Sequence, residues 1–364
     1  MKNKIPIAKL KIVSVCPYCH GKDFVKAGFR LKKFEKIQVF YCNHCKKKFT
    51  PLITKNKTYP ISLILQSLIW FNRFVEPQEI VRKIKEKYGY KITPQTINNW
   101  VKEYDRLIPF KRMRKYLKQK EDFNLKEMVV EQKLFHQQIY DFKYHRFKTD
   151  LLLKEDFRNY KQKVIKDFLE LIIAECPHRV FQKSDLRSSE FKNVFNLDKV
   201  RIISKKNRAN EMARFVMQAV ANNKERHKEL ENFVLFCDSV TMAVEVPVLL
   251  DKDDIDHFRA MLGFDVPLEI EDDAVITGHI DILQLRNGII HIMDFKPSAK
   301  KYKPISQLTI YALALSRLTG LRLHSFKCAW FDEDDYFEFF PLHVVYKKSK
   351  KRKKFGHRGL KIKE

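Results

Sequence analysis

The sequence predicts a multidomain α+β protein, with a small β domain, a three-helix domain, a helical middle and a C-terminal α/β domain. Three observations carry this prediction. They are two Cys-x-x-Cys pairs near the N-terminus, helical periodicity over 60–105, and two apolar strands joined by a turn over 278–297. The 364 residues suffice for several domains, and the 45% apolar content is that of a globular chain.

The chain is strongly basic, but its charge is unevenly distributed. The formal net charge is +28; residues 1–60 hold 15 Lys/Arg against 2 Asp/Glu, and residues 346–364 hold 10 against 1. Residues 240–345 hold only 10 basic against 17 acidic side chains. We expect DNA, single- or double-stranded, at the basic ends and cations in the acidic region. A solvated, solubilising segment is the alternative for the basic tail 346–364.

The chain carries no mark of export or of membrane insertion. It has no signal peptide, and no apolar run approaches the roughly 20 residues that a spanning helix needs. We therefore expect a cytoplasmic protein without a membrane partner.

Residues 1–55 are predicted to form a zinc ribbon. Four of the seven cysteines stand in two Cys-x-x-Cys pairs separated by 22 residues, among short alternating stretches that indicate hairpin strands. Two such turns form a closed tetrahedral site for one structural zinc ion, which replaces a core too small to be stable alone. The expected zinc ligands are Cys16, Cys19, Cys42 and Cys45.

Residues 58–118 are predicted to form a helix-turn-helix domain. The first helix spans roughly 61–74, the second follows Pro77, and the third begins at Pro94 with Thr93 as its cap. The third helix presents polar side chains that suit base edges in the major groove, although an ordinary helical bundle with a polar face is the alternative. The expected DNA-reading residues are Gln95, Thr96, Asn98 and Asn99.

The ribbon and these helices together resemble the N-terminal DNA-binding part of insertion-sequence transposases, including the aromatic and cysteine spacing from Tyr41 to Phe49. Residues 119–204 are predicted to be a helical linker region. Within it, 136–153 interleaves aromatic and basic side chains, which at helical spacing are more often core than a nucleic-acid surface.

Residues 205–345 show a definite order of elements: helix, three strands, helix, strand. A helix bearing Glu211 precedes a strand bearing Glu245, and the turn Asn287-Gly288 joins the second and third strands.

Asp281 on the second strand and Asp294 and Lys296 on the third place charge in strands that otherwise read as buried. Strand alternation puts Asp294 and Lys296 on one face. Two carboxylates on adjacent apolar strands repel each other unless a cation lies between them, and such oxygen ligands suit Mg²⁺ or Mn²⁺. A buried ion-pair network is the alternative.

Four motifs follow one another in this region: Glu245, Gly278-x-Ile-Asp281, Asp294-x-Lys296 and Gln307-x-x-x-Tyr311. Together they resemble the RecB-like exonuclease branch of the PD-(D/E)XK nuclease superfamily over about 205–332. The resemblance implies a restriction-endonuclease-like core, Asp281 and Asp294 as Mg²⁺ or Mn²⁺ ligands, and Lys296 as a catalytic residue. It also implies that Gln307 and Tyr311 contact the DNA backbone.

The chain departs from that family pattern in two respects. The upstream acid is either Glu245, which we prefer, or Glu211, which otherwise serves as an additional ligand or an ion-pair partner. Many RecB-like nucleases hold an iron–sulfur cluster on four cysteines, but only three cysteines remain outside the ribbon, so no such cluster is expected. We read His279 as a polar strand residue beside the site rather than a ligand.

The sequence therefore predicts a Mg²⁺- or Mn²⁺-dependent deoxyribonuclease, targeted to DNA by its ribbon and helix-turn-helix. The alternative is a non-catalytic DNA-binding regulator, or a mobile-element accessory protein, with a retired nuclease fold. Retired members typically lose the lysine or a metal-binding aspartate, and this chain keeps Asp281, Asp294 and Lys296. A transposase proper is disfavoured because 106–205 cannot hold a second catalytic fold.

Overall fold

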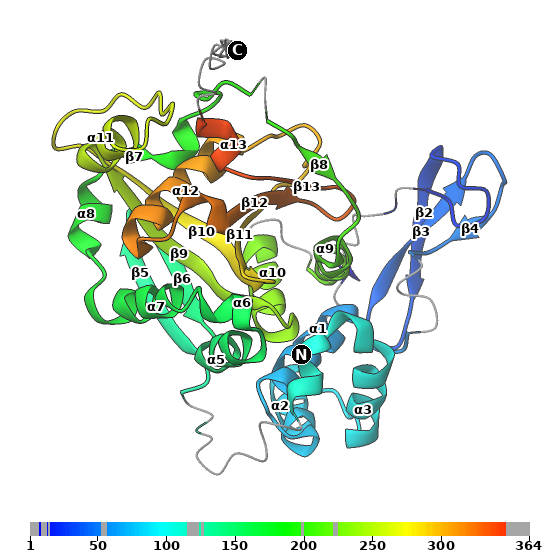
Figure 1. Ribbon diagram of the computed structural model, residues 1–364. Coiled ribbons are helices and arrows are strands. Elements are labelled where there is room, and N and C mark those ends of the chain that lie inside the picture. Colours follow the sequence, from blue (N-terminus) through cyan, green and yellow to red (C-terminus); the bar gives the residue numbers. More distant parts are fainter. Residues whose placement is uncertain are drawn as a thin grey trace, which may run out of the picture.

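The structure is a computed structural model of the chain, shown in Figure 1. It describes residues 7–8, 13, 15–51, 57–114, 124, 127–197, 200–220 and 225–346. The basic tail predicted over 346–364 lies outside the described residues except for Tyr346.

The N-terminal unit is a small sheet with a four-cysteine cluster. Strands β2 (Phe24–Leu31) and β3 (Lys36–Cys42) form an antiparallel hairpin, and β1 (Ile7–Ala8) and β4 (Lys48–Phe49) also pair with β3. Only a small apolar core supports this sheet, in which the rings of Phe24, Phe40 and Phe49 pack on one another.

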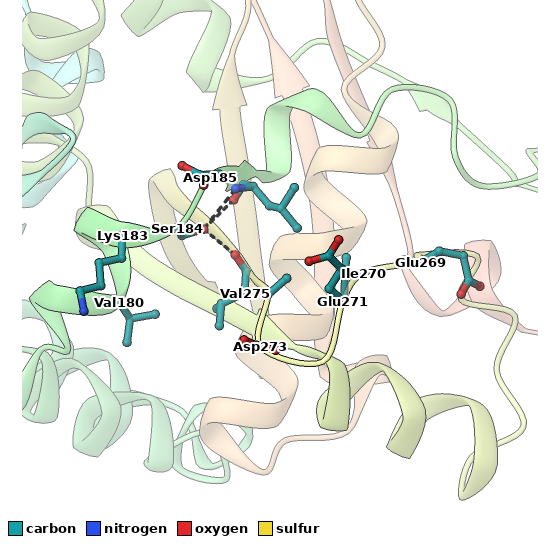
Figure 2. A pocket seen from close by; sticks show the side chains of 11 residues that line it. Val180, Lys183, Ser184, Asp185, Glu269, Ile270, Glu271, Asp273 and Val275 are labelled. Atoms are coloured by element: carbon teal, nitrogen blue, oxygen red, sulfur yellow. Dashed lines mark hydrogen bonds between the residues drawn. The ribbon is translucent and has the colours of Figure 1, made fainter.

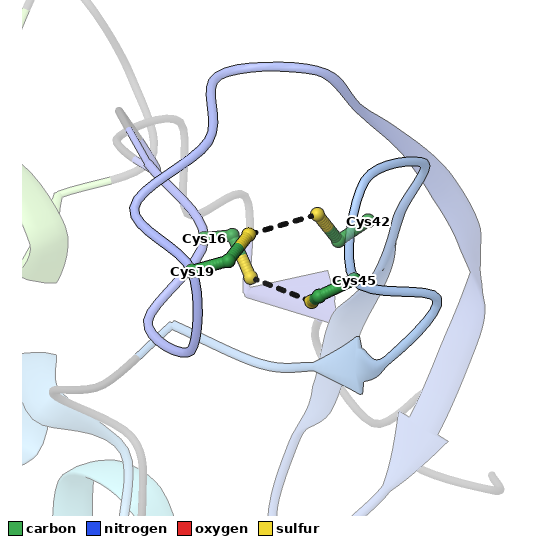
Figure 3. Close-up of side chains that lie close together, drawn as sticks. All are labelled: Cys16, Cys19, Cys42 and Cys45. Carbon is green, nitrogen blue, oxygen red and sulfur yellow. Dashed lines mark hydrogen bonds between the residues drawn. The ribbon is translucent and has the colours of Figure 1, made fainter.

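The four predicted thiolates converge at one end of this sheet (Figure 3). Cys16 Sγ lies 3.6 Å from Cys45 Sγ, and Cys19 Sγ lies 3.5 Å from Cys42 Sγ. Two sulfurs bound to one tetrahedral zinc at about 2.3 Å stand roughly 3.8 Å apart. The cluster is therefore consistent with the structural zinc site that the sequence predicts.

Three helices follow: α1 (Ile61–Asn72), α2 (Pro77–Tyr88) and α3 (Pro94–Glu103). The starts predicted at Pro77 and Pro94 are confirmed, and Thr93 caps α3 by accepting a hydrogen bond from the Thr96 backbone N–H. Gly89, in the left-handed conformation with φ 72°, ends α2. The three helices bury their apolar stripes against one another, as helical periodicity requires.

The middle of the chain is mostly helical, as predicted, but it begins with two strands instead of a helix. Strands β5 (Val130–His136) and β6 (Gln138–Tyr144) form a hairpin, and β6 pairs with β9 (Thr241–Asp251) of the C-terminal region. In β5, Leu134 and His136 are buried and Phe135 between them is exposed, a strand alternation that the helical interpretation overlooked. The helices that follow are α5 (Arg146–Glu155), α6 (Phe157–Tyr160), α7 (Val164–Glu175) and α8 (His178–Lys183).

A nine-stranded mixed sheet dominates the rest of the molecule (Figure 1). Its order is β5-β6-β9-β10-β11-β12-β13-β8, with β7 beside β10; β11 and β12 are parallel, as are β7 and β10. The further strands are β7 (Leu186–Arg187), β8 (Ile203–Ser204), β10 (Val275–Arg286), β11 (Ile289–Phe295), β12 (Phe326–Phe331) and β13 (Tyr336–Phe339). The further helices are α9 (Arg208–Ala219), α10 (Arg226–Cys237), α11 (Lys252–Ala260), α12 (Ile305–Thr319) and α13 (Leu342–Val345).

The three-helix unit shares an apolar core with the sheet. Helix α1 packs on α9 and α10, and the same core reaches the strand residues Val244, Ile282 and Phe295. At the end of α1 the guanidinium of Arg73 lies 4.7 Å from the ring centroid of Phe236 on α10. The two regions are thus joined by packed side chains. In the described ranges, no helix has both the length and the apolarity needed to cross a membrane.

Zinc should be lost from the ribbon when one thiolate is removed. Cys42→Ser should lower bound zinc by about one equivalent per chain relative to the wild type and expose the ribbon amides to solvent exchange, because the aromatic core alone is small. The measurement is metal analysis together with hydrogen exchange over residues 15–51. Cys328→Ser, at a buried thiol outside the cluster, is the matched control and should keep the wild-type zinc content. Unchanged zinc in Cys42→Ser would contradict the assignment.

Candidate active site

Three carboxylates form a row across the adjacent strands β9, β10 and β11. The strand register places Asp281 opposite Glu245 on one side and opposite Asp294 on the other. Lys296 follows the end of β11, and its Nζ lies 3.0 Å from Asp294 Oδ2. The structure therefore brings together the four residues to which the sequence assigned a catalytic role.

Glu245 interrupts the regular strand at this row. Its φ is 53°, in the left-handed region, although the residues on both sides belong to the strand β9. A non-glycine residue in this conformation costs roughly 1–2 kcal/mol and persists only where its surroundings hold it. Such strained residues cluster at functional sites, so this backbone outlier marks the row as a candidate functional site.

Helix α10 adds two side chains that the sequence prediction missed. His227 Nδ1 lies 3.8 Å from Asp281 Oδ2, and ligand atoms of His227, Glu231 and Asp281 all lie within 4.8 Å of one another. Glu231 is only 6% exposed. The signal in the sequence was an acid next to the apolar stripe of a helix that directly precedes β9. The helix acid that was considered, Glu211 on α9, is instead an ion-pair partner, 2.7 Å from Arg106.

Burial and mutual repulsion shift the pKa values of the row. Burial, followed by the Asp281 charge, raises the pKa of Glu245 to about 8 and the pKa of Asp294 well above its ordinary range. Burial and the Glu245 charge do the same for the pKa of Glu231. Burial acts on Asp281 too, but hydrogen bonds with His227 and Asp294 and the Lys296 charge outweigh it and lower the pKa of Asp281 to about 2. The cluster thus retains protons while Asp281 stays charged.

The carboxyl of Asp294 is almost fully buried and poorly satisfied. It is 1% exposed, no hydrogen bond of good geometry reaches either of its oxygens within the described part of the chain, and its charged neighbours are Asp281 and Lys296, whose Nζ lies 3.0 Å from Oδ2. Poorly satisfied buried carboxyl oxygens are costly, and a divalent cation would satisfy them. A set of carboxylate oxygens is the donor set that Mg²⁺ and Mn²⁺ prefer, so the residues present fit such an ion.

Gln307 and Tyr311 on α12, the pair that the resemblance assigns to the DNA backbone, lie next to each other, and Tyr311 lies near Asp281 and Asp294. Gln307 Nε2 donates a hydrogen bond to Tyr311 Oη over 2.8 Å. Burial raises the pKa of Tyr311, and the charges of Asp281 and Asp294 add to the rise. The ring of Tyr311 approaches β10 closely because residue 278 is glycine; a Cβ there would lie 2.3 Å from Tyr311 Cε1.

The polar residues of α3 form a separate set. Gln95 and Asn99 are exposed, and Gln95 Nε2 donates a hydrogen bond to Asn99 Oδ1 over 2.8 Å. Thr96 and Asn98 are half-buried. Figure 1 places α3 at the outer side of the three-helix unit, away from β10 and β11. Gln95 and Asn99 are therefore available at the surface, Thr96 and Asn98 only in part, and none of the four takes part in the acidic row.

A cavity of about 650 Å³ lies elsewhere, between α8, β7 and the segment 269–275 (Figure 2). Four carboxylates line it, namely Asp185, Glu269, Glu271 and Asp273. None of the residues predicted for catalysis or DNA binding does so. This cavity is therefore distinct from the candidate active site.

The raised pKa values make the stability of the metal-free protein depend on pH. The folded chain keeps the Glu245 proton up to about pH 8, whereas an unfolded chain releases it near 4.5. The free energy of unfolding without Mg²⁺ or Mn²⁺ should therefore fall as pH rises through this window. At about 1.4 kcal/mol per pKa unit, the shift from 4.5 to about 8 makes the contribution of Glu245 at most on the order of 5 kcal/mol.

Urea unfolding across this pH range checks that expectation. Glu245→Gln keeps the side-chain shape without the titrating proton, so its stability should fall less than that of the wild type. Glu271→Gln, at an exposed position, is the control and should follow the wild type. Equal pH slopes in the wild type and Glu245→Gln would show that Glu245 is not held in this acidic environment.

Comparisons of the chain with protein-family models, with curated proteins and with solved structures find no match. The assignment of the site therefore rests on its own geometry: a four-cysteine cluster in a small N-terminal sheet, and an acidic row in a C-terminal mixed sheet.

Proposed function

We propose that the protein is a metal-dependent DNA nuclease that hydrolyses phosphodiester bonds at the row formed by Glu245, Asp281 and Asp294. One observation carries the proposal: acids aligned across three adjacent strands, with Asp294 buried, poorly hydrogen-bonded and next to Lys296. This is the arrangement that the resemblance to PD-(D/E)XK nucleases leads one to expect. Glu231 on α10 offers a further carboxyl oxygen next to Asp281.

The position of each residue indicates its role in the proposed hydrolysis. Asp281 and Asp294 would hold Mg²⁺ or Mn²⁺, which when bound supplies Lewis acidity toward a phosphoryl oxygen. Lys296 keeps a positive charge beside Asp294, where it stabilises negative charge that develops on the phosphate. Gln307, which is half-buried, is the member of the pair suited to hydrogen-bond the DNA backbone, and the buried Tyr311 accepts a hydrogen bond from its amide.

DNA binding is assigned to the ribbon and the three-helix unit. The basic excess of residues 1–60 favours phosphate contacts, and the exposed amides of Gln95 and Asn99 on α3 suit base edges. One molecule would thus combine DNA binding, by these N-terminal regions, with DNA cleavage at the acidic row. The rival function is a DNA-binding regulator with a retired nuclease fold; the retention of Asp294 and Lys296 favours the enzyme.

Removing Asp294 and removing Lys296 should each abolish or strongly reduce DNA cleavage, but for different reasons. Asp294→Ala should lose both Mn²⁺ binding and activity because it removes a ligand. Lys296→Ala should keep Mn²⁺ binding and lose rate on the order of 10²–10³-fold, as expected for a single electrostatic stabiliser. The measurements are Mn²⁺ titration and cleavage of single- and double-stranded DNA with Mg²⁺, Mn²⁺ or EDTA.

Lys301→Ala is the matched control, because it removes an exposed lysine five positions along the same segment and should cleave like the wild type. Metal-free Asp294→Ala should remain folded, since loss of one buried carboxyl relieves crowding. If the wild type cleaves no DNA or RNA with any of these ions, the result contradicts the nuclease proposal and favours the DNA-binding regulator. Wild-type rates in Lys296→Ala would remove Lys296 from the mechanism.

Sequence preference should depend on α3, and salt-dependent affinity on the basic ends. Asn98→Ala combined with Asn99→Ala should reduce the preference for the best DNA sequence about tenfold or more, because one good base contact is worth about 1–3 kcal/mol. Deleting 347–364 should instead reduce the salt dependence of binding, since each phosphate contact adds a log–log slope of about −0.9. Binding to selected and random duplexes across salt concentrations separates the two effects. An unchanged preference in the double variant would contradict a reading role for α3.

A further inference from the structure

A second group of metal-ligating side chains lies outside the ribbon and the acidic row. His136 ends β5, Cys176 follows α7, and His178 begins α8. His136 Nε2 lies 2.9 Å from His178 Nδ1 and 3.8 Å from Cys176 Sγ. All three ligand atoms lie within 4.8 Å of one another, which is the spacing of atoms that share one small centre.

These separations are close to those of a transition-metal site. With metal–nitrogen bonds of about 2.05 Å and a metal–sulfur bond of about 2.3 Å, tetrahedral geometry separates two nitrogens by roughly 3.3 Å and a nitrogen and a sulfur by roughly 3.6 Å. The observed 2.9 Å and 3.8 Å differ from these values by a few tenths of an ångström, which rotation about side-chain bonds can absorb. The sulfur–sulfur distances in the ribbon, 3.6 Å and 3.5 Å, likewise differ by a few tenths of an ångström from the ideal value of roughly 3.8 Å.

The surroundings of His136 orient its ring as the neighbours of a metal-bound histidine do. Its other nitrogen, Nδ1, lies 2.9 Å from His279 Nε2, and its ring stacks on Phe181 with centroids 4.2 Å apart. Tyr140 in turn stacks on His279 at 3.5 Å. A histidine that binds a metal through Nε2 carries its proton on Nδ1 and donates it to such an acceptor.

From this geometry we infer that His136, Cys176 and His178 form a second transition-metal site, of the class that takes Zn²⁺. One thiolate and two imidazoles are borderline-soft ligands that suit zinc and not Mg²⁺. The described residues supply three ligands, so the fourth position is left to water. Binding releases the thiol proton of Cys176, which passes to solvent.

A metal bound at this site would link the turn between α7 and α8 to β5, which forms one edge of the nine-stranded sheet. The contact between α8 and β5 is otherwise made by the stacking of Phe181 on His136 and by hydrogen bonds such as Gln182 Nε2 to Phe135 O, 2.9 Å long and exposed. Exposed hydrogen bonds contribute little net stability, so a metal would add a stronger link at this edge than they do. Without a metal, His178, His136 and His279 would form only a chain of hydrogen-bonded imidazoles.

Zinc stoichiometry of the full chain separates these two states and does not depend on nuclease activity. The wild type should bind about two zinc ions, and Cys176→Ser and His178→Ala about one each. Cys42→Ser should also bind about one, and a combined Cys42→Ser and His178→Ala variant about none. His324→Ala removes an exposed imidazole elsewhere and should keep both ions.

Cobalt substitution identifies which site each ion occupies. A four-thiolate centre and a centre with one thiolate and two imidazoles give different cobalt absorption bands, so His178→Ala should lose only the second set. Circular dichroism with the retained ribbon bands shows whether each variant remains folded. One zinc per wild-type chain, unchanged in Cys176→Ser and His178→Ala, would overturn the proposal and leave the imidazole chain as the description of this cluster.

Discussion

The packing of α10 is the interaction on which the rest of the architecture depends. Its apolar residues contact α1 and α9 and continue into the core of the sheet. The same helix carries His227 and Glu231 to Asp281. A helix that is buried against so many partners cannot turn about its axis without losing apolar contacts on every side. The position of the two polar side chains is therefore set by packing that has nothing to do with their chemistry.

A protein that gathers two buried and two half-buried carboxyl groups in one place loses stability there. Desolvation and repulsion act against folding whenever these groups are charged, and the left-handed Glu245 adds backbone strain. The ribbon lacks a large apolar core, and a few aromatic rings and four thiolates take its place. In both places the polypeptide alone is incomplete, and an ion would supply the missing attraction.

The sequence predicts well what depends on local periodicity. Strand alternation and the Asn287-Gly288 turn were enough to put Asp294 and Asp281 on paired strands, and Thr93-Pro94 was enough to start α3. It predicts poorly what depends on contacts between distant segments. The hairpin β5–β6 is completed by pairing with β9, a hundred residues later, so its aromatics were taken for a helix. Glu231 was missed because only the packing of α10 distinguishes it from the other acids in helices.

The apolar core shared by the three-helix unit and the sheet fixes the distance between α3 and the acidic row. A module on a flexible linker can search for its target while the attached site reaches any point within the length of its tether. Here α1 is packed on α9 and α10, and Arg73 stacks on Phe236 at the junction, so α3 and the acidic row are held as parts of one body. A nuclease built in this way would behave as a ruler and cut its strand at a constant offset from the sequence it reads.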